Sequence, residues 1–130
     1  MEAHTMDLTI DCLEKDAIVL VKLSGIMDFE EHKRFAEETF SFAKKHNAHK
    51  IFVSMLDVIP QLTVLEIDDM PKTLIECGAG PEHRIAALHN PPPPHDNGFV
   101  FFRNAAFLKS LRIKQFTSKN EAFAWLKSEP

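Results

Sequence analysis

Segments with apolar side chains at consecutive positions alternate along this chain with segments whose apolar residues recur at helical spacing. Residues 17–24 (AIVLVKLS) and 50–56 (KIFVSML) are of the first kind. Strands with this pattern are buried on both faces, which occurs mainly in parallel sheets covered by helices. The alternation therefore predicts an α/β fold with a mainly parallel sheet.

The N-terminal part of the chain predicts a β-hairpin. In residues 6–12 (MDLTIDC), apolar and polar side chains alternate, which is typical of a half-exposed edge strand. A short turn at 13–16 makes this strand antiparallel to the next, which we expect Gly25 to end. The full pattern is ββαβαβαβα: a five-stranded, mostly parallel mixed sheet with an antiparallel N-terminal edge strand and about four helices. Without a linker or an internal repeat, residues 1–130 are predicted to form a single domain.

Capping motifs mark where three of the helices begin. A polar residue followed three positions later by Glu satisfies free main-chain N–H groups in the first helical turn. The first helix is expected to run from Asp28 to about His46, with Asn47 as its stop. In the second, Pro71 is expected either at a kink or in the first turn of a helix. The capping pairs are Asp28 with Glu31, Thr63 with Glu66, and Ser118 with Glu121.

Phe supplies nearly all aromatic residues, with eleven Phe beside one Trp and no Tyr. A Phe side chain serves packing rather than polar chemistry, so a catalytic Tyr is excluded. Phe99 and Phe123 are candidates for outward-facing positions at an apolar pocket or a dimer interface, because burying a Phe contributes about 1.5–3 kcal/mol. A third helix is expected over about 98–110, capped by Asp96 or Asn97. Its predicted buried side comprises Phe101, Phe102, Ala105, Ala106 and Leu108.

Charge and composition exclude several classes of protein. The net charge is −4 and the pI about 5.9, which argues against general nucleic-acid binding, since that needs a concentrated basic patch. No apolar stretch approaches the roughly 20 residues that span a bilayer, and the N-terminus does not have the form of a signal peptide. Two cysteines form no disulfide framework. We therefore expect a cytoplasmic protein with reduced thiols.

The C-terminal part of the chain carries motifs of a known family. A helix with the aromatic pair Phe101–Phe102, a strand with Arg112 and Phe116, and a helix with an acidic-Ala-x-x-Trp-Leu motif at 121–126 follow one another. Together with the LSGIMDFEE stretch and the strand RIAAL, they resemble the SpoIIAA-like branch of the STAS domains, also described as STAS/Sec14-like. The resemblance covers about residues 6–127, and its motifs concern packing.

The resemblance implies a STAS-like fold and a non-enzymatic binding module. It implies a protein partner or a small apolar or lipid ligand, since Sec14-like relatives bind lipids. STAS domains of the anti-anti-sigma type carry a phosphorylatable Ser, in an Asp-Ser-type motif, at the start of the helix after the third strand. Here no Ser follows Asp57, and Thr63 is the only hydroxyl residue near the helix start. Thr63 is therefore the phosphorylation candidate if the chain is a phosphorylation-regulated anti-sigma-factor antagonist.

The least usual local feature is the run Pro91–Pro94. Ligand crevices of parallel α/β sheets lie beyond the carboxyl ends of the strands, and this stiff loop leaves such an end. One interpretation is a rigid lip over a pocket, with His89, His95, Asp96 and Phe99 as ligand-binding residues. The other is a stiff connection without a ligand. If the pocket exists, His89, His95 and Asp96 are also the acid–base candidates of a small-ligand enzyme.

The seven His residues do not form a recognisable metal-binding motif. The chain has neither H-E-x-x-H nor paired C-x-x-C spacing, and it lacks a dinucleotide fingerprint and a Gly-rich phosphate loop. We therefore expect no metal and no cofactor. Three hypotheses remain: a binding module with a possible homodimer interface, a small-ligand enzyme, and a phosphorylation-regulated antagonist.

Overall fold

A computed structural model describes residues 4–93 and 96–128; of Phe99 it describes the main chain alone. Within these residues the elements follow the predicted ββαβαβαβα order. Their bounds are β1 (Met6–Leu13), β2 (Ile18–Met27), α1 (Phe29–Lys45), β3 (Lys50–Pro60), α2 (Val64–Glu76), β4 (Arg84–Leu88), α3 (Gly98–Leu108), β5 (Ile113–Phe116) and α4 (Lys119–Lys127).

The strands form one sheet in which spatial order equals sequence order, β1-β2-β3-β4-β5. β1 pairs antiparallel with β2, and each following pair is parallel. The predicted α/β class, with a mixed sheet and an antiparallel edge strand, is confirmed. Because β2 to β5 run in the same direction, their carboxyl ends meet at one edge of the sheet.

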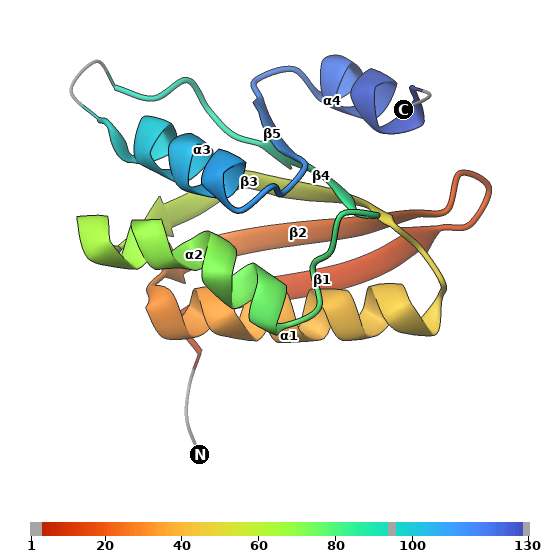
Figure 1. Cartoon of the computed structure of the whole chain (residues 1–130), viewed down its shortest axis with the longest axis horizontal. Helices are drawn as coiled ribbons and strands as arrows, with labels where there is room; N and C mark the ends of the chain where they lie inside the picture. Colours follow the sequence, from red (N-terminus) through yellow and green to blue (C-terminus); the bar gives the residue numbers. More distant parts are fainter. Residues whose placement is uncertain (1–3, 94–95, 129–130) are drawn as a thin grey trace.

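The helices cover the two faces of the sheet unequally (Figure 1). α1, α2 and α3 lie on one face, where Phe35 and Leu74 pack against Val21 and Val53 in the larger core. α4 lies on the opposite face, where a smaller core forms around Phe52. Successive side chains of a strand point to opposite faces, so each buried strand contributes to both cores.

The structure tests the predicted outward-facing position of Phe123 but not that of Phe99. Phe123 is half-buried in the smaller core, and its ring stacks on that of Phe52 with 4.6 Å between centroids; it does not form a free outer patch. The side chain of Phe99 lies outside the described residues.

The predicted buried side of α3 is partly wrong. Ala105 and Ala106 are buried and Phe102 is half-buried. Phe101 is 41% exposed and Leu108 is 80% exposed. This helix is so rich in apolar residues that its sequence does not mark one face, and α3 packs mainly against α2.

Gly25 does not end β2, contrary to expectation. The strand continues to Met27, and Gly25 pairs with Met6. Its φ of +106° is a conformation that favours glycine, and a Cβ built there would lie 2.4 Å from the carbonyl oxygen of Thr5. Gly25 therefore permits the close approach of the chain that precedes β1.

Pro71 lies inside α2, at neither the helix start nor a break between two segments. α2 continues from Val64 to Glu76, and Pro71 is fully buried in it. Proline lacks the N–H that would bond to the carbonyl four residues earlier, which is the carbonyl of Ile67. The Pro71 ring and the neighbouring Met70 side chain are both buried.

The capping predictions hold in part: Asp28, Thr63 and Ser118 cap their helices, whereas Asn97 begins α3 without a side-chain cap hydrogen bond. Thr63 and Glu66 form a complete reciprocal capping box. Asp28 accepts a hydrogen bond from the Glu31 N–H at 2.8 Å, and the positive φ of Asn47 ends α1 as expected. The Glu31 carboxylate, however, does not return to the cap; it binds the chain before and within β1.

Candidate functional site

A cavity of about 280 Å³ lies between the sheet and the helices α1, α2 and α3. Val53, Ala87 and Ile113 belong to its sheet wall, and Phe35 and Leu74 to its helix wall. Most of its lining side chains are apolar. The polar ones are those of His32, His89, Asp96 and Gln115.

Strand alternation determines which residues line the cavity. On β4, Ile85 and Ala87 line it, whereas the intervening Ala86 and Leu88 belong to the smaller core on the other face. His89 follows in the same alternation and lines the cavity as well. Because the Ala87 side chain is small, it leaves more space in this wall than a larger aliphatic side chain would.

Methionine is prominent in the lining. Met27 ends β2, Met55 lies on β3 and Met70 on α2, and all three border the cavity. The unbranched, polarisable Met side chain adapts to ligands of different shape. This composition suits an apolar ligand better than a highly polar one.

The segment after β4 contributes residues to the cavity. Asp96 and Gly98 line it together with His89. The Asp96 carboxylate accepts a hydrogen bond from the Gly98 N–H at 2.8 Å. At the other end of the segment, the side-chain amide of Asn90 donates to the main-chain oxygen of Leu56 at 2.8 Å, which ties the loop to β3.

Of the predicted ligand-binding residues, the structure brings His89 and Asp96 to one cavity. The Nδ1 atom of His89 lies 2.7 Å from the carbonyl oxygen of Asn90. His95 lies outside the described residues, as does the side chain of Phe99. The acid–base hypothesis for His89, His95 and Asp96 therefore stays a prediction.

His32 lines the same cavity and was not singled out from the sequence. It lies on α1, is 2% exposed, and its Nε2 atom is 3.4 Å from the main-chain oxygen of Met70. Its Nδ1 atom is buried and has no hydrogen-bond partner among the described residues. The available sequence signal was the position of His32 between Phe29 and Phe35, at helical spacing on the buried stripe.

Burial holds His32 in its neutral form. Removal from water lowers the pKa of this imidazole from its ordinary value of 6.5 to about 4, against a smaller opposite effect of the Met70 carbonyl. At neutral pH the ring is uncharged. The helix side of the cavity therefore presents a neutral polar group and not a cation.

Thr63, the phosphorylation candidate, is exposed at the N-terminus of α2, directly after the third strand. Its hydroxyl accepts a hydrogen bond from the Glu66 N–H at 3.1 Å, and the Glu66 carboxylate accepts one from the Thr63 N–H at 2.8 Å. A phosphoryl group on this hydroxyl would disrupt the cap and lie beside the Glu66 carboxylate.

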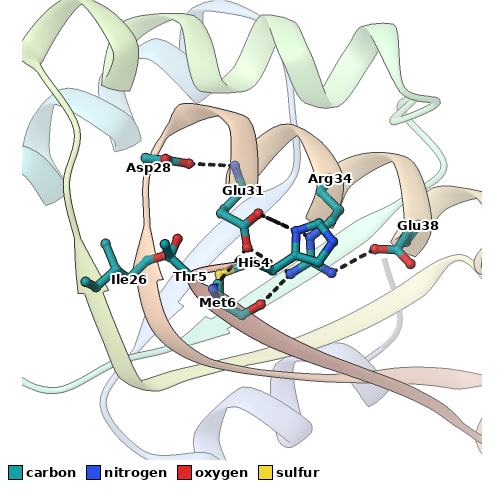
Figure 2. A network of polar contacts seen from close by, with 8 residues as sticks. All are labelled: His4, Thr5, Met6, Ile26, Asp28, Glu31, Arg34 and Glu38. Carbon is teal, nitrogen blue, oxygen red and sulfur yellow. Dashed lines mark hydrogen bonds and ion pairs between the residues drawn. The ribbon is translucent and has the colours of Figure 1, made fainter. Parts of the chain in front are cut away.

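A polar network fastens the start of β1 to α1 (Figure 2). The buried Glu31 carboxylate accepts from the Met6 N–H at 3.1 Å and pairs with Arg34 at 2.9 Å. Arg34 in turn donates to the Met6 carbonyl, and the Nδ1 atom of His4 lies 3.0 Å from the Oε1 atom of Glu31. The hydrogen bonds from Arg34 hold the pKa of Glu31 below its ordinary value.

This network borders a second hollow of about 500 Å³, on the surface of α1. Its lining is strongly polar and includes Lys33 and Glu37. The buried carboxylate of Glu31 and the Arg34 guanidinium already bind one another and the Met6 main chain. We assign this region a structural role.

Two further classes of site are absent from the residues that the structure describes. No group of three or more His, Cys, Asp or Glu side chains is arranged to hold a metal ion there. None of the described helices combines the length and the apolar character needed to cross a membrane.

Neither a family model nor a curated protein matches this sequence. Solved structures match its fold. An anti-sigma factor antagonist from Mycobacterium paratuberculosis aligns with a TM-score of 0.62 and 11% identity over 95% of both chains. An uncharacterized protein with a SpoIIAA-like fold from Shewanella loihica aligns with a TM-score of 0.60 and 16% identity over 97% of both chains. The anti-sigma factor antagonist SpoIIAA, in its unphosphorylated form, aligns with a TM-score of 0.51 and 13% identity over 95% of this chain and 100% of that one.

These similarities concern the whole chain and not a fragment of it. At identities of 11–16% they establish the architecture, which is a SpoIIAA-like fold. The fold implied by the sequence resemblance is thereby confirmed. The chemistry of the site has to be argued from this chain's own residues.

Proposed function

We propose that this SpoIIAA-like domain is a non-enzymatic binding module that holds a small apolar ligand between its sheet and the helices α1, α2 and α3. The observation that carries the proposal is the cavity of about 280 Å³ with its mainly apolar lining. Its lining comes from four strands and three helices, so it is a feature of the whole fold rather than a surface irregularity.

The size of the cavity limits the ligand. An engineered cavity of about 150 Å³ binds benzene, and sites for drug-sized ligands begin at roughly 300 Å³. Scaled from the benzene case, the present cavity suits a ligand of roughly eleven non-hydrogen atoms. A medium-length aliphatic chain or a two-ring compound has this size, whereas a complete phospholipid does not fit inside.

The cavity walls argue for binding rather than for a packing defect. Cavities in cores are costly because the residues around them lose contacts. Here Ala87 on β4 lines the cavity, where a larger side chain would reduce its volume. A ligand that occupies the space would restore these contacts and stabilise the folded domain.

Native mass spectrometry of freshly purified protein tests this proposal. A retained ligand is expected as an added mass of small-molecule size that disappears after denaturation and solvent extraction. The same spectrum reports the number of copies and so tests the expectation of a homodimer. Protein without any added mass, which also fails to bind medium-chain alcohols, ethers and carboxylates added to it, would contradict the proposal.

A matched pair of variants locates the ligand. Ala87→Leu places a larger side chain in the cavity and should weaken ligand retention while the domain stays folded by circular dichroism. Ala124→Leu makes the same change at an exposed position of α4, on the opposite face of the sheet, and should retain the ligand. Equal retention by both variants would place the ligand elsewhere.

A second candidate is a regulator that binds a protein partner under control of phosphorylation. It is supported by the fold that this chain shares with two anti-sigma factor antagonists and by the exposed position of Thr63 at the start of α2. The completed capping box opposes it, because phosphorylation would introduce like charges next to Glu66.

Intact-mass analysis distinguishes this second candidate. The chain is incubated with ATP and a kinase-containing lysate of its own source, beside a Thr63→Ala variant. Phosphorylation of the natural chain but not of the variant would support the regulator. Absence of the added phosphoryl mass in both would remove Thr63 from consideration.

A further inference from the structure

We propose that α2 and α3 form a homodimer interface, in which α3 of each chain packs against α2 of a second copy. The inference goes beyond the proposed function, because it assigns a partner to the outer sides of two helices whose inner sides line the cavity. It is argued from the exposed apolar side chains of both helices and from the opposite charges that the helices carry.

The outer side of α3 is apolar. Phe107 is 81% exposed and Leu108 is 80% exposed. The exposed large apolar side chains of this helix are Val100, Phe101, Phe107 and Leu108. At about 3.6 residues per turn they fall on one side of the helix, opposite the buried Ala105 and Ala106. A helix that is apolar on both sides is typical of one that is covered on both sides, and the described part of the chain covers only the inner one.

α2 adds a second exposed apolar surface beside the first. The two helices pack against each other and run in about the same direction along one face of the sheet (Figure 1). Leu65 of α2 is 78% exposed, and Val64 and Ile75 are exposed as well. Neighbouring apolar side chains of this size mark interaction sites on soluble proteins. The outer sides of α2 and α3 are therefore considered together, as the α2–α3 surface.

The two halves of the α2–α3 surface differ in the sign of their charges. Residues 98–112 include no acidic residue, and Arg103 and Lys109 among them are exposed. On α2, the cation Lys72 is exposed beside a larger number of exposed carboxylates. These carboxylates belong to Asp68, Asp69 and Glu76. Within the described residues, none of these charged side chains forms an ion pair. The α3 half is therefore basic, the α2 half is acidic, and both can pair with a partner.

Two-fold symmetry makes a second copy of the chain the matching partner. A two-fold axis that runs parallel to the helices and between them places α3 of each chain over α2 of the other, so the same contact forms twice. The basic half then faces the acidic half in both contacts, which favours association. An axis that runs across the helices in the plane of the interface places α2 over α2 and α3 over α3, where like charges repel. The charges thus select the first arrangement.

An anionic lipid surface matches the α2–α3 surface less well than a second copy does. Such a surface attracts Arg103 and Lys109 on the α3 half. It repels the carboxylates of Asp68 and Asp69, which are exposed on the neighbouring helix. A second copy presents both signs of charge together with apolar side chains, so it complements both halves at once.

Charge reversal tests the interface in solution. One variant carries Asp68→Lys and Asp69→Lys on α2, and the other carries Arg103→Glu and Lys109→Glu at α3. Analytical ultracentrifugation measures the association of each full chain at neutral pH and low ionic strength. The natural chain should be dimeric, and the dissociation constant of each variant alone should rise at least about tenfold, because like charges then face each other. An equimolar mixture of the two variants should form a heterodimer, because opposite charges face each other again.

Two further variants separate the interface from general effects of charge. Asp7→Lys together with Glu14→Lys makes the same change of net charge on β1 and in the turn after it, and this variant should stay dimeric. Phe107→Gln removes an exposed apolar ring without altering any charge and should weaken the dimer. All the substituted side chains are exposed, so each variant should keep the circular dichroism spectrum of the natural chain.

Several outcomes would overturn the proposal. A natural chain that stays monomeric up to millimolar concentration would do so, as would a dimer that survives both charge reversals or a mixture of variants that stays monomeric. Binding of the monomeric natural chain to vesicles of phosphatidylcholine and phosphatidylglycerol would show that the α2–α3 surface serves lipid instead. Ligand retention in the cavity is measured separately, so each of these outcomes leaves the proposed function in place.

Discussion

The Nε2 atom of His32 lies 3.4 Å from the main-chain oxygen of Met70, and this contact joins α1 to α2 at the wall of the cavity. It places a neutral imidazole in a helix wall that also contains the apolar side chains of Phe35, Met70 and Leu74. The burial of His32 also makes the stability of the domain depend on pH.

Acid should destabilise the domain through His32. Its pKa falls from 6.5 to about 4 on folding because of burial, so between these values the unfolded chain binds a proton that the native protein does not. Stability therefore falls as the pH falls through this window, by about 3 kcal/mol in total. The measurement is urea unfolding of the natural chain and of His32→Leu at pH 7.5 and pH 4.5. The natural chain should lose more stability than His32→Leu when the pH is lowered from 7.5 to 4.5. An equal loss in both proteins would contradict the burial of His32.

Replacement of Glu31 should loosen β1. In Glu31→Ala, the Met6 N–H and the Arg34 guanidinium lose their shared partner, at a cost of about 2 kcal/mol. Glu38→Ala removes the more exposed partner of Arg34 and should change stability by less than about 1 kcal/mol. Chemical denaturation at pH 7 checks both values, and equal effects would mean that the network does not fasten the strand.

The Glu31 network has its own pH dependence. Arg34 lowers the pKa of Glu31 below its ordinary value of 4.5, so the carboxylate contributes stability above pH 4.5, and this contribution is lost as the pH falls through the folded-state pKa. The stability difference between the natural chain and Glu31→Ala should accordingly shrink as the pH is lowered from 7 to below 4.5. A difference that stays constant over this whole range would show that the charge of Glu31 is immaterial.

Substitution of Gly25 should be strongly destabilising. In Gly25→Ala, the new Cβ meets the Thr5 carbonyl oxygen at 2.4 Å in a backbone conformation with φ of +106°, and we expect a loss of about 2 kcal/mol or more. Gly80→Ala is the control, because the atoms that its Cβ meets belong to the flexible Glu82 carboxylate. Thermal unfolding compares the two, and a Gly25→Ala domain as stable as Gly80→Ala would mean that the backbone there is relaxed.

Local signals in the sequence predicted the elements well. Asp28, Thr63 and Ser118 each accept a hydrogen bond from the residue three positions later, as their spacing to Glu indicates. Such caps act within one helical turn, and the doubly apolar strands identified the parallel sheet. Gly25 failed as a strand end because its role is set by Thr5, twenty positions away in the sequence.

The candidate site was predictable only in part. His89 and Asp96 were identified because they flank a proline run at the carboxyl end of a strand, where α/β sheets bind ligands. His32 was missed because its importance arises from Met70 on another helix and from the space left by Ala87 on β4. Neither the volume of a cavity nor an unpaired ring nitrogen can be read from residue spacing.

The most direct test of the account is a methyl NMR titration. The chain has five Met residues, of which Met27, Met55 and Met70 line the cavity, while Met6 is buried outside it. In protein labelled at the methionine methyl groups, decan-1-ol should shift the resonances of those three residues and leave that of Met6 in place. Ala87→Leu should reduce the shifts. If the three resonances do not move, or if Met6 moves together with them, the cavity is not the ligand site.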